Sequence, residues 1–337
     1  MSRNATKDLT TGSPMKLILG FGIPLLFGML FQQFYNMMDT IIVGKFLGVS
    51  ALASVGATGS INFMIIGFCM GVCNGFAIPV AQRFGAKDEH GMRKFVANSV
   101  WLSIIFAVVM AVLVCVFCRQ ILELMNTPED IIDGSYSYIF VIFLGIPATY
   151  MYNLLSGIMR SLGDSKTPLY LLIFSSILNI ILDLLSIIVL KMGVAGAAWA
   201  TVIAQAVSGF CCLGVIWKKF PILHVQREEW QPDKLCILNL CNMGIPMGLQ
   251  YSITAIGSVI IQAAVNSLGS VAVASVAAAV KINMFLCCPY DAMGSTMATY
   301  AGQNVGAGKF DRLKQGEKSC TLLGLVYGIA AFIFILL

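Results

Sequence analysis

The stretch that decides the fold reads ALASVGATGSINFMIIGFCMGVCNGFAIPVAQ, from Ala51 to Gln82, and it contains no charged residue. A run of 18 or more apolar residues without charges is typical of a helix that spans a lipid bilayer. A second charge-free run extends from Leu235 to Val280. The sequence therefore predicts an all-α, polytopic membrane protein.

The composition of the whole chain agrees with this interpretation. Of its 337 residues, 58% are hydrophobic and 11% are charged, and the mean hydropathy is +0.86. A soluble domain usually has about a quarter of its residues charged, so the apolar surface of this chain must face lipid. The first apolar run, from Leu17, is too long for the core of a signal peptide, and we expect it to be a spanning helix.

Apolar segments separated by polar loops divide the chain into four parts. We expect a tail at 1–14, a six-helix transmembrane bundle at 15–217, a linker at 218–236 and a partial second bundle of three helices at 237–337. The nine predicted spanning segments are Lys16–Gly44, Ala51–Gln82, Phe95–Cys118, Gly134–Met159, Pro168–Leu190, Gly193–Trp217, Leu238–Asn266, Val271–Gln303 and Ser319–Leu337.

The basic residues alternate between the loops. Seventeen Lys and Arg residues, Arg160 among them, fall in one set of loops and tails, whereas Lys45, Arg119 and Lys191 fall in the other. Cytoplasmic loops carry the excess of Lys and Arg, so we expect a multi-pass protein of the plasma membrane with its N-terminus in the cytoplasm. The net charge of +5 reflects this bias and does not indicate a nucleic-acid partner.

Short motifs return in the second half of the chain. The order is kept in five pairs: Gly22-Ile23-Pro24 and Gly244-Ile245-Pro246, Leu47-Gly48 and Leu268-Gly269, Ala53-Ser54-Val55 and Ala274-Ser275-Val276, Ile61-Asn62 and Ile282-Asn283, and Gln82-x-x-Gly85-Ala86 and Gln303-x-x-Gly306-Ala307. All but the first share an offset of 221 residues, as from Gln82 to Gln303. Six helices precede the second copy, which predicts a parallel repeat about an axis along the membrane normal.

The second copy is incomplete by this count, because only three of its six expected helices are present. The chain ends on the apolar residues Phe334 to Leu337 without a charged flank. We therefore expect the sequence to be shortened relative to its relatives. The alternative is a natural nine-helix protein.

Four charged residues fall inside predicted helices, where a charge costs about 3 kcal/mol at the bilayer centre. Asp183 is the clearest case, because Asn179 lies one turn earlier on the same helix face. A carboxylate and an amide offer oxygen ligands to Na⁺, and a buried carboxylate can equally hold a proton. The alternative is a structural hydrogen bond between helices. Lys281 and Asp291 either line a cavity or pair with another helix.

Asp39, the fourth charge, follows several polar residues in the first predicted helix. Asn36 lies three residues before Asp39 and shares its face, and Pro24 removes a backbone hydrogen bond and allows a kink. The alternative places Asp39 at the end of the helix near water, since Lys45 follows closely.

The chain resembles the multidrug and toxic-compound extrusion (MATE) transporters. The features that carry the resemblance, in chain order, are Gly22-Ile23-Pro24 through Asp39, Arg160-Ser161-x-Gly163-Asp164, Asn179-x-x-x-Asp183, Met192-Gly193-Val194-x-Gly196-Ala197-Ala198-x-Ala200-Thr201 and Gly302-Gln303-Asn304-x-Gly306-Ala307-Gly308. The resemblance implies two six-helix bundles around a V-shaped cavity. It also implies export of small organic, often cationic, compounds coupled to Na⁺ or H⁺, with no other cofactor.

The same resemblance implies where the coupling ion binds. The family pattern of one branch maps a cation site, for Na⁺ or a proton, onto Asp39, Asn179, Asp183 and Thr201. Gating or supporting roles fall to Pro24, Tyr35, Asn36 and Asn153. Another branch has an acidic residue in the seventh helix, whereas here that helix offers only Gln250, which joins Lys281 and Asp291 as a candidate for lining the cavity.

Three other classes of protein compete with an antiporter. A lipid-linked oligosaccharide flippase would need several cations in its cavity, and Lys281 is the only cation predicted inside a helix. An inactive fragment of a transporter is the second alternative. An intramembrane enzyme is the least favoured, because the only two histidines, His90 and His224, both fall in polar loops.

Overall fold

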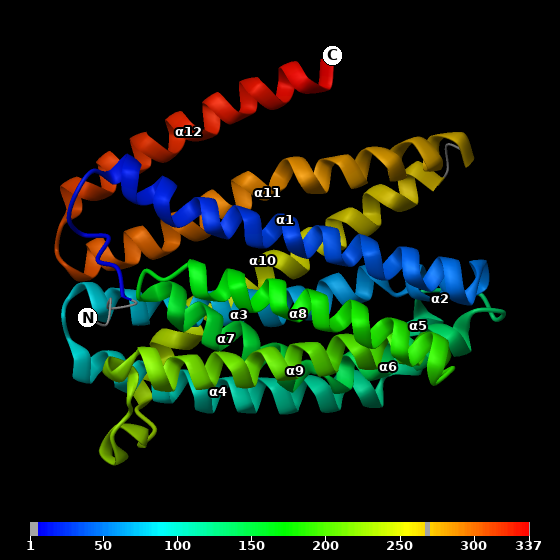
Figure 1. The fold of residues 1–337 in the computed structure, drawn as a ribbon, viewed down its shortest axis with the longest axis horizontal. Helices are drawn as coiled ribbons and strands as arrows, with labels where there is room; N and C mark the ends of the chain where they lie inside the picture. The colour runs from blue at the N-terminus through cyan, green and yellow to red at the C-terminus, as the bar shows by residue number, and fades with distance from the viewer. Residues whose placement is uncertain (1–5, 267–269, 337) are drawn as a thin grey trace.

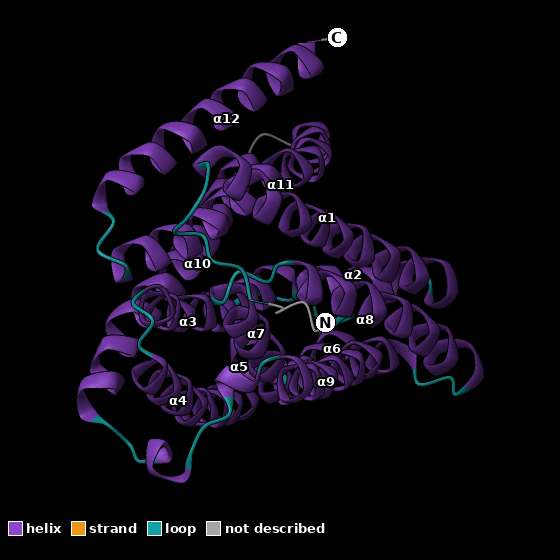
Figure 2. Cartoon of the chain, turned by 60° about the vertical axis from the view of Figure 1, so that its left-hand side comes forward, coloured by secondary structure: helices purple, strands orange, loops and turns teal. Residues whose placement is uncertain are grey.

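The computed structural model describes residues 6–266 and 270–336, apart from a number of side chains between 262 and 281 that include Lys281. The repeat match at Leu268-Gly269 lies outside the described residues. All regular elements of the described part are helices, which confirms the predicted all-α fold (Figure 2).

The elements are α1 (Pro14–Leu47), α2 (Val49–Ala57), α3 (Gly59–Gly85), α4 (Glu89–Val116), α5 (Cys118–Leu124), α6 (Ile132–Leu144), α7 (Ile146–Ser161), α8 (Lys166–Leu184), the π-helix η1 (Leu185–Val189), α9 (Gly193–Lys219), the 3₁₀-helices η2 (Pro221–Leu223) and η3 (Arg227–Trp230), α10 (Lys234–Asn266), α11 (Ser270–Gly306) and α12 (Phe310–Leu336).

Seven of these helices are long and apolar enough to cross a bilayer, and an eighth span forms if α6 and α7, bent by 46°, count as one. Two predicted segments are broken, since α2 ends before Thr58 and α6 ends before Gly145. The eighth predicted segment, α11, does not meet the same criterion over its described residues, although it runs for 37 residues through Pro289. Large apolar side chains such as Leu325, Ile329 and Phe332 on α12 are more than 60% exposed, as expected for residues that face lipid.

The two copies of the repeat pack against each other through their first and second helices. The first helix of each copy packs against the second helix of the other, so that α1 contacts α11 and α10 contacts α3 (Figure 1). A Cβ atom on Gly22 would lie 3.0 Å from Thr296, and one on Gly75 would lie 2.5 Å from Gly244. These two pairs correspond under the repeat offset to within one residue, as a parallel repeat requires.

The same symmetry holds where α3 and α11 end. A Cβ atom on Gly85 would collide with the carbonyl of Gln303, and one on Gly306 would collide with the carbonyl of Gln82. We call this pair of contacts the reciprocal Gln–Gly crossing. Only glycine lets the two backbones approach so closely, because every other residue adds a side chain there.

The N-terminal tail is fixed beside this crossing. Gln303 accepts a hydrogen bond from the Leu9 N–H (2.9 Å) through its side-chain oxygen and donates one to the carbonyl of Ser161 (2.8 Å). The Lys7 N–H donates to the carbonyl of Leu162 at 2.9 Å. Leu9 is 1% exposed, so the tail, the end of α7 and the end of α11 form one buried junction.

A stripe of small residues joins α3 to α10. Gly67, Gly71 and Gly75 repeat every fourth residue on α3. Gly71 and Gly75 lie against the α10 backbone at Gly248 and Gly244, and Gly67 lies against the side chain of Tyr251. Small residues at this spacing allow two helices in a membrane to pack backbone against backbone.

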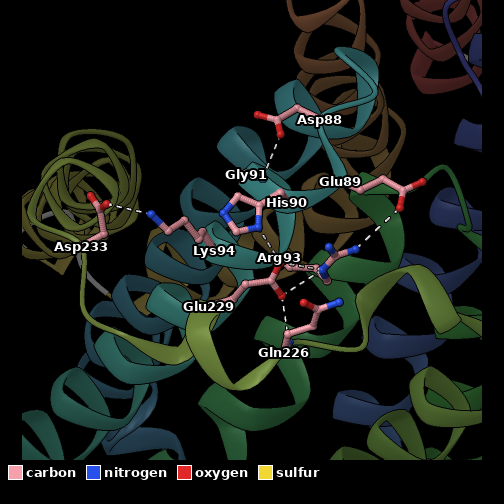
Figure 3. Close-up of polar contacts among 9 residues, drawn as sticks. All are labelled: Asp88, Glu89, His90, Gly91, Arg93, Lys94, Gln226, Glu229 and Asp233. Atoms are coloured by element: carbon pink, nitrogen blue, oxygen red, sulfur yellow. Dashed lines mark hydrogen bonds and ion pairs between the residues drawn. The ribbon is translucent and has the colours of Figure 1, made fainter.

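The linker between α9 and α10 is held against α4 by ion pairs (Figure 3). Glu229 of η3 is 0% exposed; its carboxylate accepts from Arg93 Nε at 2.9 Å and lies 2.8 Å from His90 Nδ1. Lys94 Nζ pairs with Asp233 at 3.3 Å. Burial alone would raise the pKa of Glu229, but hydrogen bonds from the Gln226 N–H, Arg93 and His90 outweigh it and hold this pKa below its ordinary 4.5.

The glycine stripe yields the first prediction. Gly71→Ala should lower the free energy of unfolding by about 1–3 kcal/mol, because its Cβ would meet the α10 backbone at Met247 and Gly248. Reversible denaturant unfolding in mixed micelles measures this loss. The control is Gly257→Ala on α10, whose Cβ would meet nothing within 4 Å. This substitution should leave stability unchanged or raise it by about 0.5–1 kcal/mol through helix propensity; equal losses in both variants would contradict the close packing.

The second prediction concerns Glu229. A carboxylate with a lowered pKa in the folded state stabilises the fold fully above its unfolded pKa, and that contribution is lost as the pH falls through the folded pKa. Hydrogen exchange of residues 220–233, corrected for the intrinsic rate, should therefore show protection at neutral pH that disappears in acid. Glu229→Gln should remove most of this protection at neutral pH, while Glu228→Gln at the exposed neighbouring position should keep it. Wild-type protection in Glu229→Gln would show that the ion pairs do not hold the linker.

Candidate functional site

Three helices bring the predicted ion-site residues to one place among the helices α1–α9. Asp39 comes from α1, Asn179 and Asp183 come from α8, and Thr201 comes from α9; α8 packs against both other helices. Asn179 and Asp183 stand one turn apart on the face of α8 that is turned away from lipid, and they are 1% and 0% exposed.

The hydroxyl of Thr201 is the centre of a hydrogen-bond network. It lies 3.2 Å from the carbonyl of Ala197, to which it donates, as helical threonines commonly do. Its oxygen accepts from the amide of Asn179 at 3.2 Å and lies 3.2 Å from the hydroxyl of Tyr35. Since the single Thr201 proton is used toward Ala197, Tyr35 is the donor in the last contact.

The carboxyl groups of Asp39 and Asp183 lie within hydrogen-bonding reach of each other. If both groups are ionised, neither carries a hydrogen that it could donate to the other. Both oxygens of Asp183, Oδ1 of Asp39 and Oδ1 of Asn179 are buried and have no hydrogen-bond partner among the described residues. Four acceptors without a donor fit a bound cation or a shared proton, because buried polar atoms otherwise find partners.

Helix α1 continues well past Asp39. It runs through Pro24 and ends only at Leu47, so Asp39 does not lie at the helix end, and one of its oxygens faces the interior. The alternative of an aspartate in water near Lys45 is therefore not what the structure shows.

The backbone changes directly after Asp183. Helix α8 ends at Leu184 and continues as the π-helix η1 from Leu185 to Val189. Short π-helical turns insert an extra residue into a helix and are frequent at functional sites. Here the π-helix interrupts the regular α-helical hydrogen bonding immediately after the buried carboxylate.

The residues predicted for gating or support separate into two groups. Tyr35 joins the network through Thr201, whereas Asn36 is exposed and contacts Gln33 of its own helix. Asn153 donates to the carbonyl of Thr149 at 2.8 Å and, like Pro24, lines a cavity beside the carboxylates.

Sequence reasoning missed Tyr138 of α6. Its side chain is 7% exposed and is electrostatically coupled to Asp39, Tyr35 and Asp183. The only signal was a tyrosine inside an apolar segment, and no spacing rule connects α6 to the other helices.

A first cavity, which we call the inner cavity, extends from the ion-site residues toward the end of α7. Its volume is about 170 Å³. Tyr35, Asn179 and Thr201 form part of its wall, and Asn74 and Arg160 also line it.

A second cavity, the interface cavity, has a volume of about 630 Å³ between α3, α7, α10 and α11. Gln250 and Asp291 both line it, while the side chain of Lys281 lies outside the described residues. Arg160 corrects the sequence analysis: it was assigned to a loop, but it belongs to α7 and its side chain lines both cavities. The reason is that loop counting considers the position of a residue and not the direction of its side chain.

Known proteins resemble the whole of this fold. A family model described as MatE matches residues 24–185 and 246–337. The chain is similar to the probable multidrug resistance proteins YoeA and YpnP of Bacillus subtilis, with 31% and 30% identity over 94% and 91% of the chain. It spans 70% and 68% of the lengths of these relatives.

Solved structures give the same result. A MATE protein in complex with MaL6 superimposes with a TM-score of 0.92 at 24% identity, covering 99% of this chain and 74% of that one. A multidrug resistance MATE family transporter of the MOP superfamily, in an outward-facing conformation, gives 0.90 at 25% identity over 97% of this chain and 73% of that one. The chain therefore belongs to the MATE family of membrane transporters, and it is not an enzyme.

Proposed function

We propose that the chain carries out cation-coupled antiport, in which Na⁺ or H⁺ entering the cell drives the export of an organic compound. The observation that carries this proposal is the group of four buried oxygens of Asp39, Asn179 and Asp183 without a donor. Carboxylate and amide oxygens are the ligands that hard cations take, and two facing carboxyl groups can equally share one proton. Thr201 positions Asn179 and ties α1 to the site through Tyr35.

Ion binding would favour one arrangement of α1 over another. Without a cation or a proton the carboxylates of Asp39 and Asp183 repel each other, and with one they are drawn together. Because Asp39 is on α1 and Asp183 is on α8, the occupancy of the site biases the position of α1 against α8. Pro24 is the point at which α1 lacks a backbone hydrogen bond and bends most easily.

The inner cavity supports coupling between ion and substrate. Tyr35, Asn179 and Thr201 belong both to the ion network and to the cavity wall. A compound in this cavity therefore touches the same side chains that respond to the ion. Antiport requires ion and substrate to favour opposite states, and shared side chains provide that difference in affinity.

The relatives and the cavities support a class of substrate. Relatives named as multidrug resistance proteins support small organic substrates for this chain as well. The interface cavity of about 630 Å³ lies within the range of pockets that bind drug-sized molecules. Asp291 gives this cavity a negative charge for a cationic group.

The proposal also includes the orientation of the chain in the membrane and its division into two bundles. The tail, the turns after α3, α7 and α11, and the linker gather at one end of the molecule and hold most of its basic residues (Figure 1). We assign this end to the cytoplasm of a plasma-membrane protein. Residues 15–217 then form the first bundle, 218–236 the linker and 237–337 the partial second bundle.

Arg160 strengthens the alternative function of a lipid-linked oligosaccharide flippase. The structure adds one cavity cation to the set considered from the sequence, which removes part of the argument against a pyrophosphate-bearing substrate. The donor-free oxygens still favour antiport, because moving a lipid-linked anion has no need of a second, cation-binding site.

The third prediction tests the ion site. In liposomes with either a Na⁺ or an H⁺ gradient imposed alone, one of the two should drive export of an organic dye by the wild-type chain. Asp183→Asn should reduce this transport to the level of empty liposomes, because an amide neither binds a proton nor balances Na⁺. Asp39→Asn should act in the same direction, and both variants should still fold, since the amide fits the same space.

The control is Asp130→Asn, which removes an exposed carboxylate between α5 and α6 and should retain full transport. For Na⁺, ligand linkage predicts a second readout: saturating Na⁺ should raise the unfolding temperature of wild type by several degrees and that of Asp183→Asn hardly at all. Transport by Asp183→Asn at the wild-type rate, or no transport under either gradient, would contradict the proposal.

The fourth prediction tests the orientation. In a background without the native cysteines, Glu228→Cys in the linker should resist a membrane-impermeant thiol reagent applied outside intact cells. Glu129→Cys, an equally exposed position at the opposite end of the molecule, should react fully. The reverse pattern would place the N-terminus outside the cell.

A further inference from the structure

The N-terminal tail is attached to both copies of the repeat at once. The Lys7 N–H donates to the carbonyl of Leu162, just beyond the end of α7 in the first copy, at 2.9 Å. Two residues further along, the Leu9 N–H donates to the side chain of Gln303 on α11 in the second copy, also at 2.9 Å. Residues 7–10, which we call the strap, therefore bridge the two copies at the end of the molecule where the chain begins (Figure 1).

The attachment of the strap to the second copy is extensive. The side-chain amide of Asn304 donates to the carbonyl of Leu9 at 3.3 Å, and Lys309 Nζ donates to the carbonyl of Thr10 at 2.9 Å and lies 3.2 Å from its hydroxyl. The side chain of Leu9 is 1% exposed and belongs to an apolar cluster that includes Tyr300 of α11. The end of α11 and the turn after it thus hold the strap through several hydrogen bonds and one buried side chain.

The attachment of the strap to α7 is smaller. The bond from Lys7 to Leu162 is the only hydrogen bond between them among the described residues. Next to it the strap crosses Gly163, where a Cβ atom would collide with the carbonyl of Lys7, and Gly163 has a φ of +86°. This contact therefore depends on the absence of a side chain at Gly163.

The two copies come closest together at the same end of the molecule. A Cβ atom on Gly67 of α3 would meet only the side chain of Tyr251 at 3.2 Å, whereas one on Gly75 would meet the α10 backbone at 2.5 Å. At the end of α3, one on Gly85 would collide with the carbonyl of Gln303. The backbones of the two copies thus converge toward the strap, which lies at the closed end of their interface.

The length of the strap limits how far this end can open. Only two residues separate the attachment at Lys7 from the attachment at Leu9. An extended chain covers at most about 3.6 Å per residue, so two residues span about 7 Å. If the ends of α7 and α11 move apart by more than a few ångströms, the strap must leave one of them.

We propose that the strap holds this end of the molecule closed and detaches from α7 when the end opens. A transporter that works by alternating access opens its two ends in turn, by rocking one repeat against the other. The attachment to α7 gives way first, because it has one hydrogen bond whereas the attachment to α11 has several. This inference goes beyond the proposed antiport, since it concerns the movement of the two copies and does not depend on the coupling ion or the substrate.

Spin labels on the two copies test the inference. In a background without the native cysteines, Lys219→Cys at the end of α9 and Lys314→Cys on α12 provide two exposed labelling sites. Double electron–electron resonance in nanodiscs, without any gradient, measures the distance between them. Leu9→Asp should raise the ratio of the longer to the shorter distance about threefold or more, because a carboxylate in a buried apolar position is costly and expels the strap. Ser13→Asp, an exposed position in the same tail, should keep the ratio of the parent.

Gly163→Ala tests the attachment to α7 separately. Its Cβ displaces Lys7, so the same ratio should again rise about threefold, as expected for the loss of one hydrogen bond. The matched control is Gly193→Ala, because Gly193 has a φ of +62° and a Cβ atom there would meet nothing within 4 Å. Unchanged distances in both Leu9→Asp and Gly163→Ala would overturn the proposal. An equal rise in Gly193→Ala would assign the effect to backbone strain and overturn it as well.

A measurement on wild type alone covers the case in which the variants fail to fold. Hydrogen exchange resolved to single residues and corrected for the intrinsic rates should be several-fold faster for the Lys7 N–H than for the Leu9 N–H. Each opening frees the bond to Leu162, while the bond to Gln303 stays closed. Equal protection of the two amides, or slower exchange at Lys7, would overturn the assignment of α7 as the attachment that gives way.

Discussion

Hydrocarbon offers no hydrogen-bond partner, and nearly every feature of this molecule follows from that constraint. Long helices satisfy the backbone internally, glycines let helices meet without polar side chains, and many hydroxyls of helical Ser and Thr residues donate back to their own helix. Against this background the buried oxygens of Asp39, Asn179 and Asp183 are an exception, because they lie together and have no hydrogen-bond partner among the described residues. A group of acceptors of this kind fits a cation or a proton that moves between water and protein.

The candidate ion site and the two cavities are linked through a small number of side chains. Thr201 connects the carboxylate region to the inner cavity, and Arg160 connects the inner cavity to the interface cavity. In the proposed antiport, the ion therefore acts on the substrate through direct contacts, and no long-range signal is required. Since α1 supplies both Asp39 and Tyr35, a shift of this one helix alters the ion site and the cavity wall together.

The sequence predicted the helical class, the repeat and the pair Asn179 and Asp183, because each depends on local composition or on spacing within one helix. It failed where a result depends on side-chain direction or on contact between distant helices. Arg160 was read as a loop cation although its side chain turns inward, and Tyr138 was missed because nothing local relates α6 to α1. The spacing of Gly67, Gly71 and Gly75 was visible, but its partner on α10 was not. Thr201 entered only through the family resemblance, since a threonine in a Gly- and Ala-rich helix carries no signal of its own.

The reciprocal Gln–Gly crossing makes the two halves of the chain depend on each other. Each copy contributes a glycine to one contact and a backbone carbonyl to the other, so each contact needs residues from both copies. A side chain at Gly85 or Gly306 would force the ends of α3 and α11 apart, and no second change within the same copy could restore both contacts. A carboxylate such as Asp39 is needed in one copy only, whereas this crossing requires a position without a side chain in both copies.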